Sequence, residues 1–223
     1  GDPSYEDLLA MGYLSEAVVN YVTLLGWSPR GENVEREFFT MEELSQIFDI
    51  EGISKSPAIF DIEKLTYFNA HYLRELSPEA FHAAVKNPAY STREIAALLQ
   101  ARCEKLTDIP EKLDFFDALP DYGADLFTNK KSKTNADVSK AMLEAAIPAL
   151  EGITNWTNGA IHDTLVSLAE SLAVKNATLM WPVRIAAAGK AVTPGGAVEI
   201  CHILGKDETL RRLKLGLAKV SAA

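Results

Sequence analysis

The residue types that most often carry catalysis or bind metals are scattered along this chain. They are four histidines and two cysteines: His71, His82, His162, His202, Cys103 and Cys201. They form neither a CxxC nor an HExxH pattern, the spacings that bring zinc ligands together. The adjacent pair Cys201-His202 would point its side chains about 100° apart on a helix. We therefore predict no metal site in this chain.

Patterns for nucleophilic catalysis and phosphate binding are also absent. No GxSxG stretch occurs, and the acidic residues offer no pair that stands out as a general acid and base. Gly189-Lys190 resembles the end of a phosphate-binding loop, but Arg184 stands where that loop requires its first glycine. We predict no catalytic residue here.

The charge of the chain is unevenly distributed. The net charge is −9, yet Lys175–Ala223 carries eight Lys/Arg against three Asp/Glu, and residues 1–174 carry 14 against 28. Binding to nucleic acid depends on charges within about 8 Å of the phosphates at physiological salt. The basic last quarter is therefore compatible with local contact to RNA, although a solvated helix face can carry the same charge.

The sequence predicts a soluble protein of the cytoplasm. No apolar run approaches the roughly 20 residues that span a bilayer. Gly1–Asp7 has neither the basic start nor the apolar stretch of a signal peptide. The two cysteines match no disulfide framework, so we expect reduced and mostly buried thiols.

The residues between these positions predict helices almost throughout. Ser15–Gly26 has apolar residues at helical spacing, and Gly26 is expected to end that helix. Thr40–Glu43 and Ser91–Glu94 are capping boxes, Ser77-Pro78 is a helix start, and Asp207 is expected to cap a last helix that ends near Val220. Sustained polar/apolar alternation is scarce, so the predicted fold is all-α. Joints are expected around 76–78 and 122–134.

Three stretches of the sequence carry a resemblance to a known family. Met11–Pro29 reads MGYLSEAVVNYVTLLGWSP, Ile53–Leu65 reads ISKSPAIFDIEKL and is followed by NAHYLR at 69–74, and WPVRIA, TPG, ILGK and LRR follow one another between 181 and 212. They resemble, in order, the GYLPEALLNYLALLGWSP, SKSPAVFDLEKL…NGHYIR and PLRVALTG…SPG…LGKE…LRRL stretches of bacterial-type glutamyl-tRNA synthetases. The resemblance spans nearly the whole chain.

The resemblance implies an N-terminal catalytic domain with HIGH and KMSKR-type motifs, neither of which occurs here. That domain of the class I enzymes binds ATP, with Mg, and glutamate. Gly1–Ser4 resembles the residues just after the second motif. We therefore expect this chain to start there, to hold no cofactor and to be inactive alone, while the longer parent enzyme is a glutamate–tRNA ligase.

By resemblance the chain has three parts. Residues 1–77 would form a helical stem-contact domain, and residues 78–122 and 123–223 two α-helical anticodon-binding subdomains. The implied partners are tRNA(Glu) and the parent's own catalytic domain, and we expect a monomer that binds no DNA. A rival interpretation is a helical protein-interaction domain whose basic C-terminal helices contact an acidic partner.

The resemblance also implies residues that read the anticodon. Arg184 aligns with an arginine that hydrogen-bonds the middle base, a task suited to a planar, permanently charged guanidinium; the alternative is a structural ion pair near Trp181. Thr193, Pro194 and Ala197 fall where the family binds the first base. The TPGG turn holds one residue more than its relatives, and a simple tight turn is the alternative.

Arg102 aligns with the arginine that reads the third base and rejects tRNA(Gln). Ala101 stands where the family usually has proline, and a salt bridge to Glu104 is the alternative role. A parent that charges both tRNAs therefore remains an open alternative. Lys55, Tyr67 and Arg74 occupy positions that suit contacts to phosphate or sugar, which orient RNA but specify little; Tyr67 is equally suited to the core.

Overall fold

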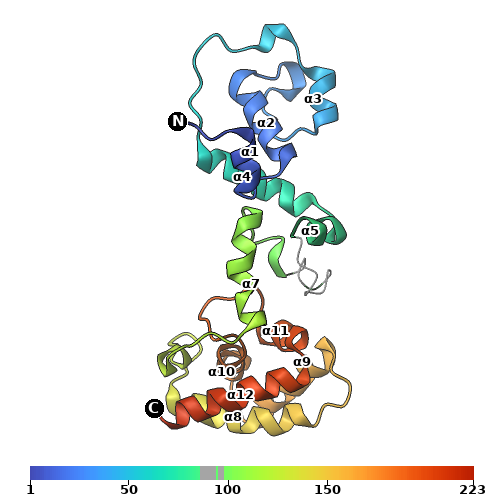
Figure 1. The fold of residues 1–223 in the computed structure, drawn as a ribbon. Coiled ribbons are helices and arrows are strands. Elements are labelled where there is room, and N and C mark those ends of the chain that lie inside the picture. Colours follow the sequence, from blue (N-terminus) through green and yellow to red (C-terminus); the bar gives the residue numbers. More distant parts are fainter. Residues whose placement is uncertain (86–93, 95–97) are drawn as a thin grey trace. The chain divides into compact units, whose positions relative to one another are not determined.

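The structure, a computed structural model, describes residues 1–85, 94 and 98–223 (Figure 1). Helices dominate these residues, and β-type pairing among them is limited to the isolated bridges Trp27–Ile53 and Asn129–Thr134. The all-α prediction is confirmed. The predicted capping box at Ser91–Glu94 depends on residues outside the described part of the chain.

The chain divides into two compact units, Gly1–Glu111 and Lys112–Ala223. Helix α7 (Ile109–Asp117) begins in the first unit and ends in the second. This division falls inside the predicted 78–122 segment. The three-part division at 77/78 and 122/123 therefore stays a prediction.

The first unit is built around the contact between helices α2 and α4. Its elements are α1 (Tyr5–Ala10), α2 (Ser15–Gly26), η1 (Gly31–Asn33), α3 (Met41–Ile47), η2 (Ile50–Gly52), α4 (Ile62–Glu75), α5 (Pro78–Val85) and η3 (Leu106–Asp108). Between α2 and α4, Tyr21 packs edge-on against Phe60 and Phe68, with ring centroids 5.5 and 5.7 Å apart. Its hydroxyl accepts a hydrogen bond from Asp61 N at 2.7 Å, which fixes the start of α4.

Side chains mark the helix ends much as predicted. Thr40 Oγ1 accepts from Glu43 N at 3.0 Å while the Glu43 carboxylate accepts from Thr40 N at 3.1 Å, the expected capping box. Ser77 Oγ accepts from Ala80 N at 3.1 Å, which confirms the helix start at Pro78. Gly26 is the last residue of α2, and the helix ends there because the backbone at Trp27 is extended.

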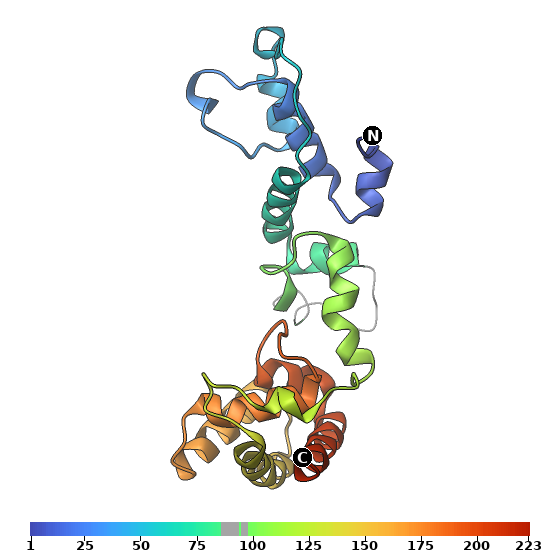
Figure 2. The same ribbon diagram turned by 90° about the vertical axis from the view of Figure 1, so that its left-hand side faces the viewer.

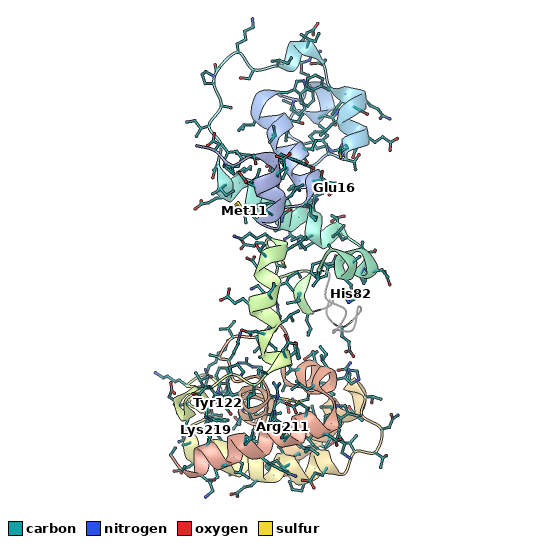
Figure 3. The ribbon with its side chains drawn as sticks, viewed as in Figure 1. Met11, Glu16, His82, Tyr122, Arg211 and Lys219 are labelled. Atoms are coloured by element: carbon teal, nitrogen blue, oxygen red, sulfur yellow. The ribbon has the colours of Figure 1, made fainter. Side chains whose placement is uncertain are left out.

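The second unit is a bundle whose longest helices, α8 and α12, lie side by side (Figures 1 and 2). Its elements after α7 are η4 (Ala124–Phe127), α8 (Ala136–Glu151), α9 (Asn158–Ser171), α10 (Asn176–Ala188), α11 (Ala197–Leu204) and α12 (Lys206–Ser221). The predicted joint at 122–134 consists of η4 and a turn closed by the Asn129–Thr134 bridge. Tyr122, at its start, lies beside Lys219 of α12, whose ammonium is 4.4 Å from the ring centroid (Figure 3).

Asp207 is not the N-cap of the last helix, contrary to prediction. Gly205 is the cap, two residues before Asp207, and helix α12 begins at Lys206. Gly205 has a φ of 84°, a left-handed value that glycine adopts without steric cost, so one residue ends α11 and begins α12. Asp207 instead lies in the first turn, where a carboxylate suits the positive end of the helix dipole.

A buried arginine holds α12 against the rest of the second unit. Arg212 is 1% exposed, and its Nη1 donates to Phe115 O at 2.6 Å and to Ala187 O at 2.8 Å. Its Nε donates to the Glu208 carboxylate at 2.8 Å. One guanidinium thus satisfies the carbonyl at the end of α10 and a carbonyl of α7 while its own charge is balanced.

Replacing Arg212 should therefore strongly destabilise the second unit. Arg212→Ala leaves Phe115 O and Ala187 O without this donor and opens a cavity, and we expect a loss of about 3–5 kcal/mol in the free energy of unfolding. Urea denaturation followed by circular dichroism measures it. Arg211→Ala is the matched control: Arg211 also pairs with Glu208 but is exposed, so its loss should have little effect. Equal effects of the two variants would contradict the role given to Arg212.

The Glu208 carboxylate should make stability depend on pH. Hydrogen bonds from Arg211, and secondarily Arg212, hold the pKa of Glu208 at about 2, below the ordinary 4.5. Because the folded pKa is depressed, the stabilisation is complete above about pH 4.5 and is lost as the pH falls toward 2. The difference in unfolding free energy between wild type and Glu208→Gln should shrink over this range. A difference that stays constant with pH would contradict the assignment.

Candidate nucleic-acid interface

The turn between α10 and α11 presents the first group of predicted site residues. Gly189 ends α10 in the left-handed conformation, with a φ of 65°, and its N–H donates to Ile185 O at 2.7 Å. A Cβ at this position would lie 3.0 Å from Tyr122 and 3.1 Å from Pro120, so the chain leaves the helix through a site that favours glycine. Residues 190–196 then form a short loop that returns to α11.

Arg184 organises this loop from within α10. Its Nη1 donates to Thr193 Oγ1 at 2.8 Å and its Nη2 to Ala191 O at 2.7 Å. The guanidinium carbon lies 4.8 Å from the ring centroid of Trp181, one helical turn earlier. The structure therefore brings Arg184 and Thr193 together. It also shows that Arg184 makes a cation–π contact and loop hydrogen bonds, and no ion pair with any described residue.

The guanidinium is half-buried, and burial lowers the pKa of Arg184. An arginine keeps its charge at neutral pH despite such a shift, because its pKa in water exceeds 12. Trp181 is itself fixed, since its Nε1 donates to Leu126 O at 3.0 Å. The result is a preoriented cation with a planar face, a group able to stack on and hydrogen-bond a base.

The other predicted residues of this loop differ in accessibility. Thr193 is partly exposed, and its hydroxyl donates to Gly195 O at 2.8 Å. Pro194 is buried, and Ala197 is 4% exposed and packs in the core of the second unit. These two side chains shape the turn. The outward side chain is instead Val192, 86% exposed, which no sequence pattern had indicated.

A second group of predicted residues lines a hollow of about 840 Å³ in the first unit. Tyr67 and Arg74 enter it from α4, and Arg102 enters from the segment before η3. Lys55 lies elsewhere, exposed on the loop between η2 and α4. The remaining lining residues are Met11, Tyr13, Ile62, Glu63, Thr66, Ala70, Ala101, Cys103, Glu104 and Lys105. Met11 marks the end of α1 beside this hollow (Figure 3).

Backbone contacts fix the segment that carries Arg102. The buried amide of Asn69 donates to Glu104 O at 2.7 Å, and Leu106 N donates to Gly12 O at 2.9 Å. Gly12 has a φ of 93°, and a Cβ there would lie 2.5 Å from Thr107 N. Only glycine therefore allows this close approach. Asn69 thus positions the backbone of the segment that carries Arg102. In the sequence it stood out only as the first residue of the NAHYLR stretch at 69–74.

Three of the seven cations described in the first unit have a carboxylate partner. Arg30 pairs with Asp49 and Glu51, Arg36 with Glu43, and Lys64 with Glu37. Among the residues described in this unit, four Lys/Arg form no ion pair: Lys55, Arg74, Arg102 and Lys105. Three of these four line the hollow, so its cations remain available to a ligand. Lys105 was not predicted, because a lone lysine in a polar segment carries no motif.

Groups for metal binding were not found where the structure describes the chain: no three His, Cys, Asp or Glu side chains converge there. Burial raises the pKa of the Cys201 thiol to about 12, which makes it a poor metal ligand and nucleophile. Both cysteines are free and buried, as predicted. In the described helices no stretch is long and apolar enough to cross a membrane.

Two protein-family models match the chain. Residues 52–217 match the anticodon binding domain, and residues 4–67 match the catalytic domain of class I tRNA synthetases (E and Q). The first match covers more than half of the chain and contains Arg102, Arg184 and Thr193. The second covers α1, α2, α3 and the first residues of α4.

Curated relatives and solved structures agree with these matches. The chain is 46% identical to a glutamate–tRNA ligase of Clostridium tetani over 99% of its own length and 46% of the relative's, and 43% identical to that of Clostridium acetobutylicum. A glutamate tRNA ligase structure from Elizabethkingia meningosepticum, in complex with its amino acid, superposes with a TM-score of 0.82 at 25% identity, over 96% of this chain and 43% of that one. One from Elizabethkingia anophelis, at 24% identity and a TM-score of 0.76, shows the same fold. The chain spans about half the length of the curated relatives it matches.

Proposed function

Because this chain belongs to the anticodon binding domain family, we propose that it recognises tRNA(Glu) as the C-terminal part of a glutamate–tRNA ligase. The complete enzyme would make glutamyl-tRNA from ATP, glutamate and tRNA. The observation that carries the proposal is the Arg184 loop, a cation preoriented by Trp181 and by the loop that it supports. An anticodon loop offers unstacked bases whose edges and faces such a group can contact.

Arg184 and its loop would read the first two anticodon bases. Arg184 would hydrogen-bond the middle base, and Thr193, with the turn shaped by Pro194 and Ala197, would contact the first. In the described structure Arg184 uses Nη1 and Nη2 on the loop itself. Reading a base therefore depends on remaining N–H groups or on exchange of one loop hydrogen bond. This dual use explains why loop shape and base recognition would be coupled.

Arg102 would read the third base and so separate tRNA(Glu), with cytosine there, from tRNA(Gln), with guanine. Its side chain is exposed and forms no ion pair with a described residue, so the Glu104 alternative has no support. The side chain is thus available to an RNA ligand. Lys55, Tyr67 and Arg74 would contact phosphate or sugar.

The chemical steps would belong to the rest of the polypeptide, which would bind ATP with Mg. An apolar hollow of about 490 Å³ in the first unit supports contact with that catalytic part. Val22 and Tyr5 line it and are 49% and 43% exposed, and both lie in the segment that matches the catalytic-domain family. We propose that the enzyme acts as a monomer in the cytoplasm.

Substitution of Arg184 should weaken binding of tRNA(Glu). We expect Arg184→Ala to cost about 1–3 kcal/mol in affinity, because it removes the base contact and the loop's anchor. Arg184→Lys keeps a charge but not the planar fork, so its affinity should fall between those of wild type and Arg184→Ala. Filter binding or fluorescence anisotropy with a transcript of tRNA(Glu) measures both. An unchanged affinity in a folded Arg184→Ala variant would remove Arg184 from the site.

Discrimination at the third anticodon base tests Arg102. The chain should bind the transcript with cytosine there more tightly than a copy with guanine, and Arg102→Gln should reduce that preference. Binding to both copies should weaken as salt rises, since phosphate contacts contribute to each. Equal wild-type binding to the two copies would favour a parent that charges both tRNAs. No binding of wild type at low salt, together with tight binding of an acidic protein, would favour a protein-interaction domain.

A further inference from the structure

The first two residues of α9, Asn158 and Gly159, form a pair whose side chain and backbone can react with each other. Asn158 is the one asparagine in the sequence that a glycine follows. Both residues are exposed, and among the residues that the structure describes none hydrogen-bonds the side-chain amide of Asn158. Its carbonyl carbon is therefore open to attack by the backbone nitrogen of the next residue.

That nitrogen is also unengaged. The first N–H groups of a helix have no acceptor within the helix, and the Thr157 hydroxyl accepts from Ala160 N, at 3.0 Å, rather than from Gly159 N. No other described group accepts from Gly159 N. Gly159 has no side chain to hinder the attack, and a Cβ built there would meet nothing within 4 Å. An alanine at 159 would therefore fit the fold while blocking the approach.

We propose that Asn158 is a site of spontaneous deamidation whose rate is set by the Thr157 cap. The Gly159 nitrogen loses its proton and bonds to the side-chain carbonyl carbon of Asn158. The bond from that carbon to the amide nitrogen breaks, and ammonia leaves a cyclic succinimide. Water then opens the ring at either carbonyl, which gives aspartate or isoaspartate. In sum, the chain takes up one water molecule and releases one molecule of ammonia, and nothing is oxidised or reduced.

The helix start controls access to this reaction. Ring closure requires the Asn158 ψ to leave the helical value of about −42°, so the first turn of α9 has to open. Thr157 holds that turn closed: its backbone is extended, with φ −118° and ψ 160°, and its side chain accepts from Ala160 N. No acidic residue adds support in this turn. Loss of the cap should raise the opened fraction, and with it the rate, about 2- to 30-fold.

The two products would affect the helix differently. Aspartate at the first helical position suits the positive end of the helix dipole. Isoaspartate carries the chain through its side-chain carbon, which lengthens the backbone between Thr157 and Ala160 and breaks the cap geometry. Trp156 precedes this point, and its Nε1 donates to Cys201 O of α11 at 3.0 Å. Isoaspartate at 158 would therefore loosen the start of α9 where the chain is tied to α11.

Ageing of the purified chain tests the proposal. The protein is incubated at neutral pH in water enriched in heavy oxygen, and the extent of conversion at each asparagine is followed by peptide mapping with mass spectrometry. Asn158 should convert to a mixture of aspartate and isoaspartate. Asn176 is the internal control, because it is also exposed and first in its helix, α10, but is followed by Ala177. It should stay intact.

Three variants separate the glycine from the cap. Gly159→Ala should abolish the conversion of Asn158, and Thr157→Ala should accelerate it about 2- to 30-fold. Ala177→Gly creates the same pair at the start of α10, which has no side-chain cap, so Asn176 should then convert faster than Asn158. This last variant keeps the cap's role testable should Thr157→Ala not fold, which circular dichroism reveals.

Each result bears on the proposal. An intact Asn158 in wild type, while a free peptide of residues 155–161 converts, would refute the site. Conversion at the wild-type rate in folded Thr157→Ala, or slower conversion of Asn176 than of Asn158 in Ala177→Gly, would refute control by the cap. None of these measurements involves RNA, so the proposed function stands or falls separately.

Discussion

The second unit depends on one buried charge. Arg212 lies in a region where an unpaired guanidinium would be strongly unfavourable, and it is tolerated only because Glu208 and two backbone carbonyls surround it. One of those carbonyls, Ala187 O, belongs to the last turn of α10. Arg184 lies in the turn before it, and the loop of residues 190–196 follows. The buried charge in α12 thus fixes the end of α10, from which the protein loop of residues 190–196 continues.

In the first unit, separate segments are held together by a buried neutral side chain, the amide of Asn69. The amide of Asn69, fully buried, donates to Glu104 O, and its Oδ1 accepts from Leu14 N at 2.8 Å. One side chain therefore connects α4, the start of α2 and the segment of residues 101–105. A buried amide with satisfied donors and acceptors specifies one arrangement, since any shift would leave polar groups without partners. The hydrogen bonds of Asn69 therefore fix the backbone of α4 and of residues 101–105, which carry Arg74, Arg102 and Lys105.

Much of the fold was predictable because it rests on local signals. The capping box at Thr40, the helix start at Pro78 and the helical spacing in Ser15–Gly26 each involve neighbours in sequence. The start of α12 was missed by two residues because Gly205 both ends α11 and caps α12, which requires a positive φ that the sequence does not reveal.

The candidate site was predictable only in part, because its residues meet through tertiary contacts. Arg184 and Thr193 are near in sequence, and the resemblance placed both at the anticodon. Arg74, Arg102 and Lys105 line the same hollow because Asn69 hydrogen-bonds Glu104 O and the backbone of residues 106–107 approaches Gly12 closely. No spacing in the sequence predicts these contacts. Lys105 gained significance only when Arg30, Arg36 and Lys64 proved to be paired and Lys105 did not.

That pairing has a consequence for how RNA would reach the protein. The chain carries a net charge of −9, so a polyanion approaching at random is repelled over most of the surface. Cations neutralised by a neighbouring carboxylate exert little attraction beyond a Debye length, whereas Arg74, Arg102 and Lys105 outnumber the two carboxylates, Glu63 and Glu104, that line the same hollow. An RNA molecule would then bind only when it approaches with its phosphates toward this hollow, before any base is recognised. Unrelated nucleic acids would dissociate quickly. If the chain binds tRNA as proposed, its acidic surface would limit the time that it spends bound to other RNAs.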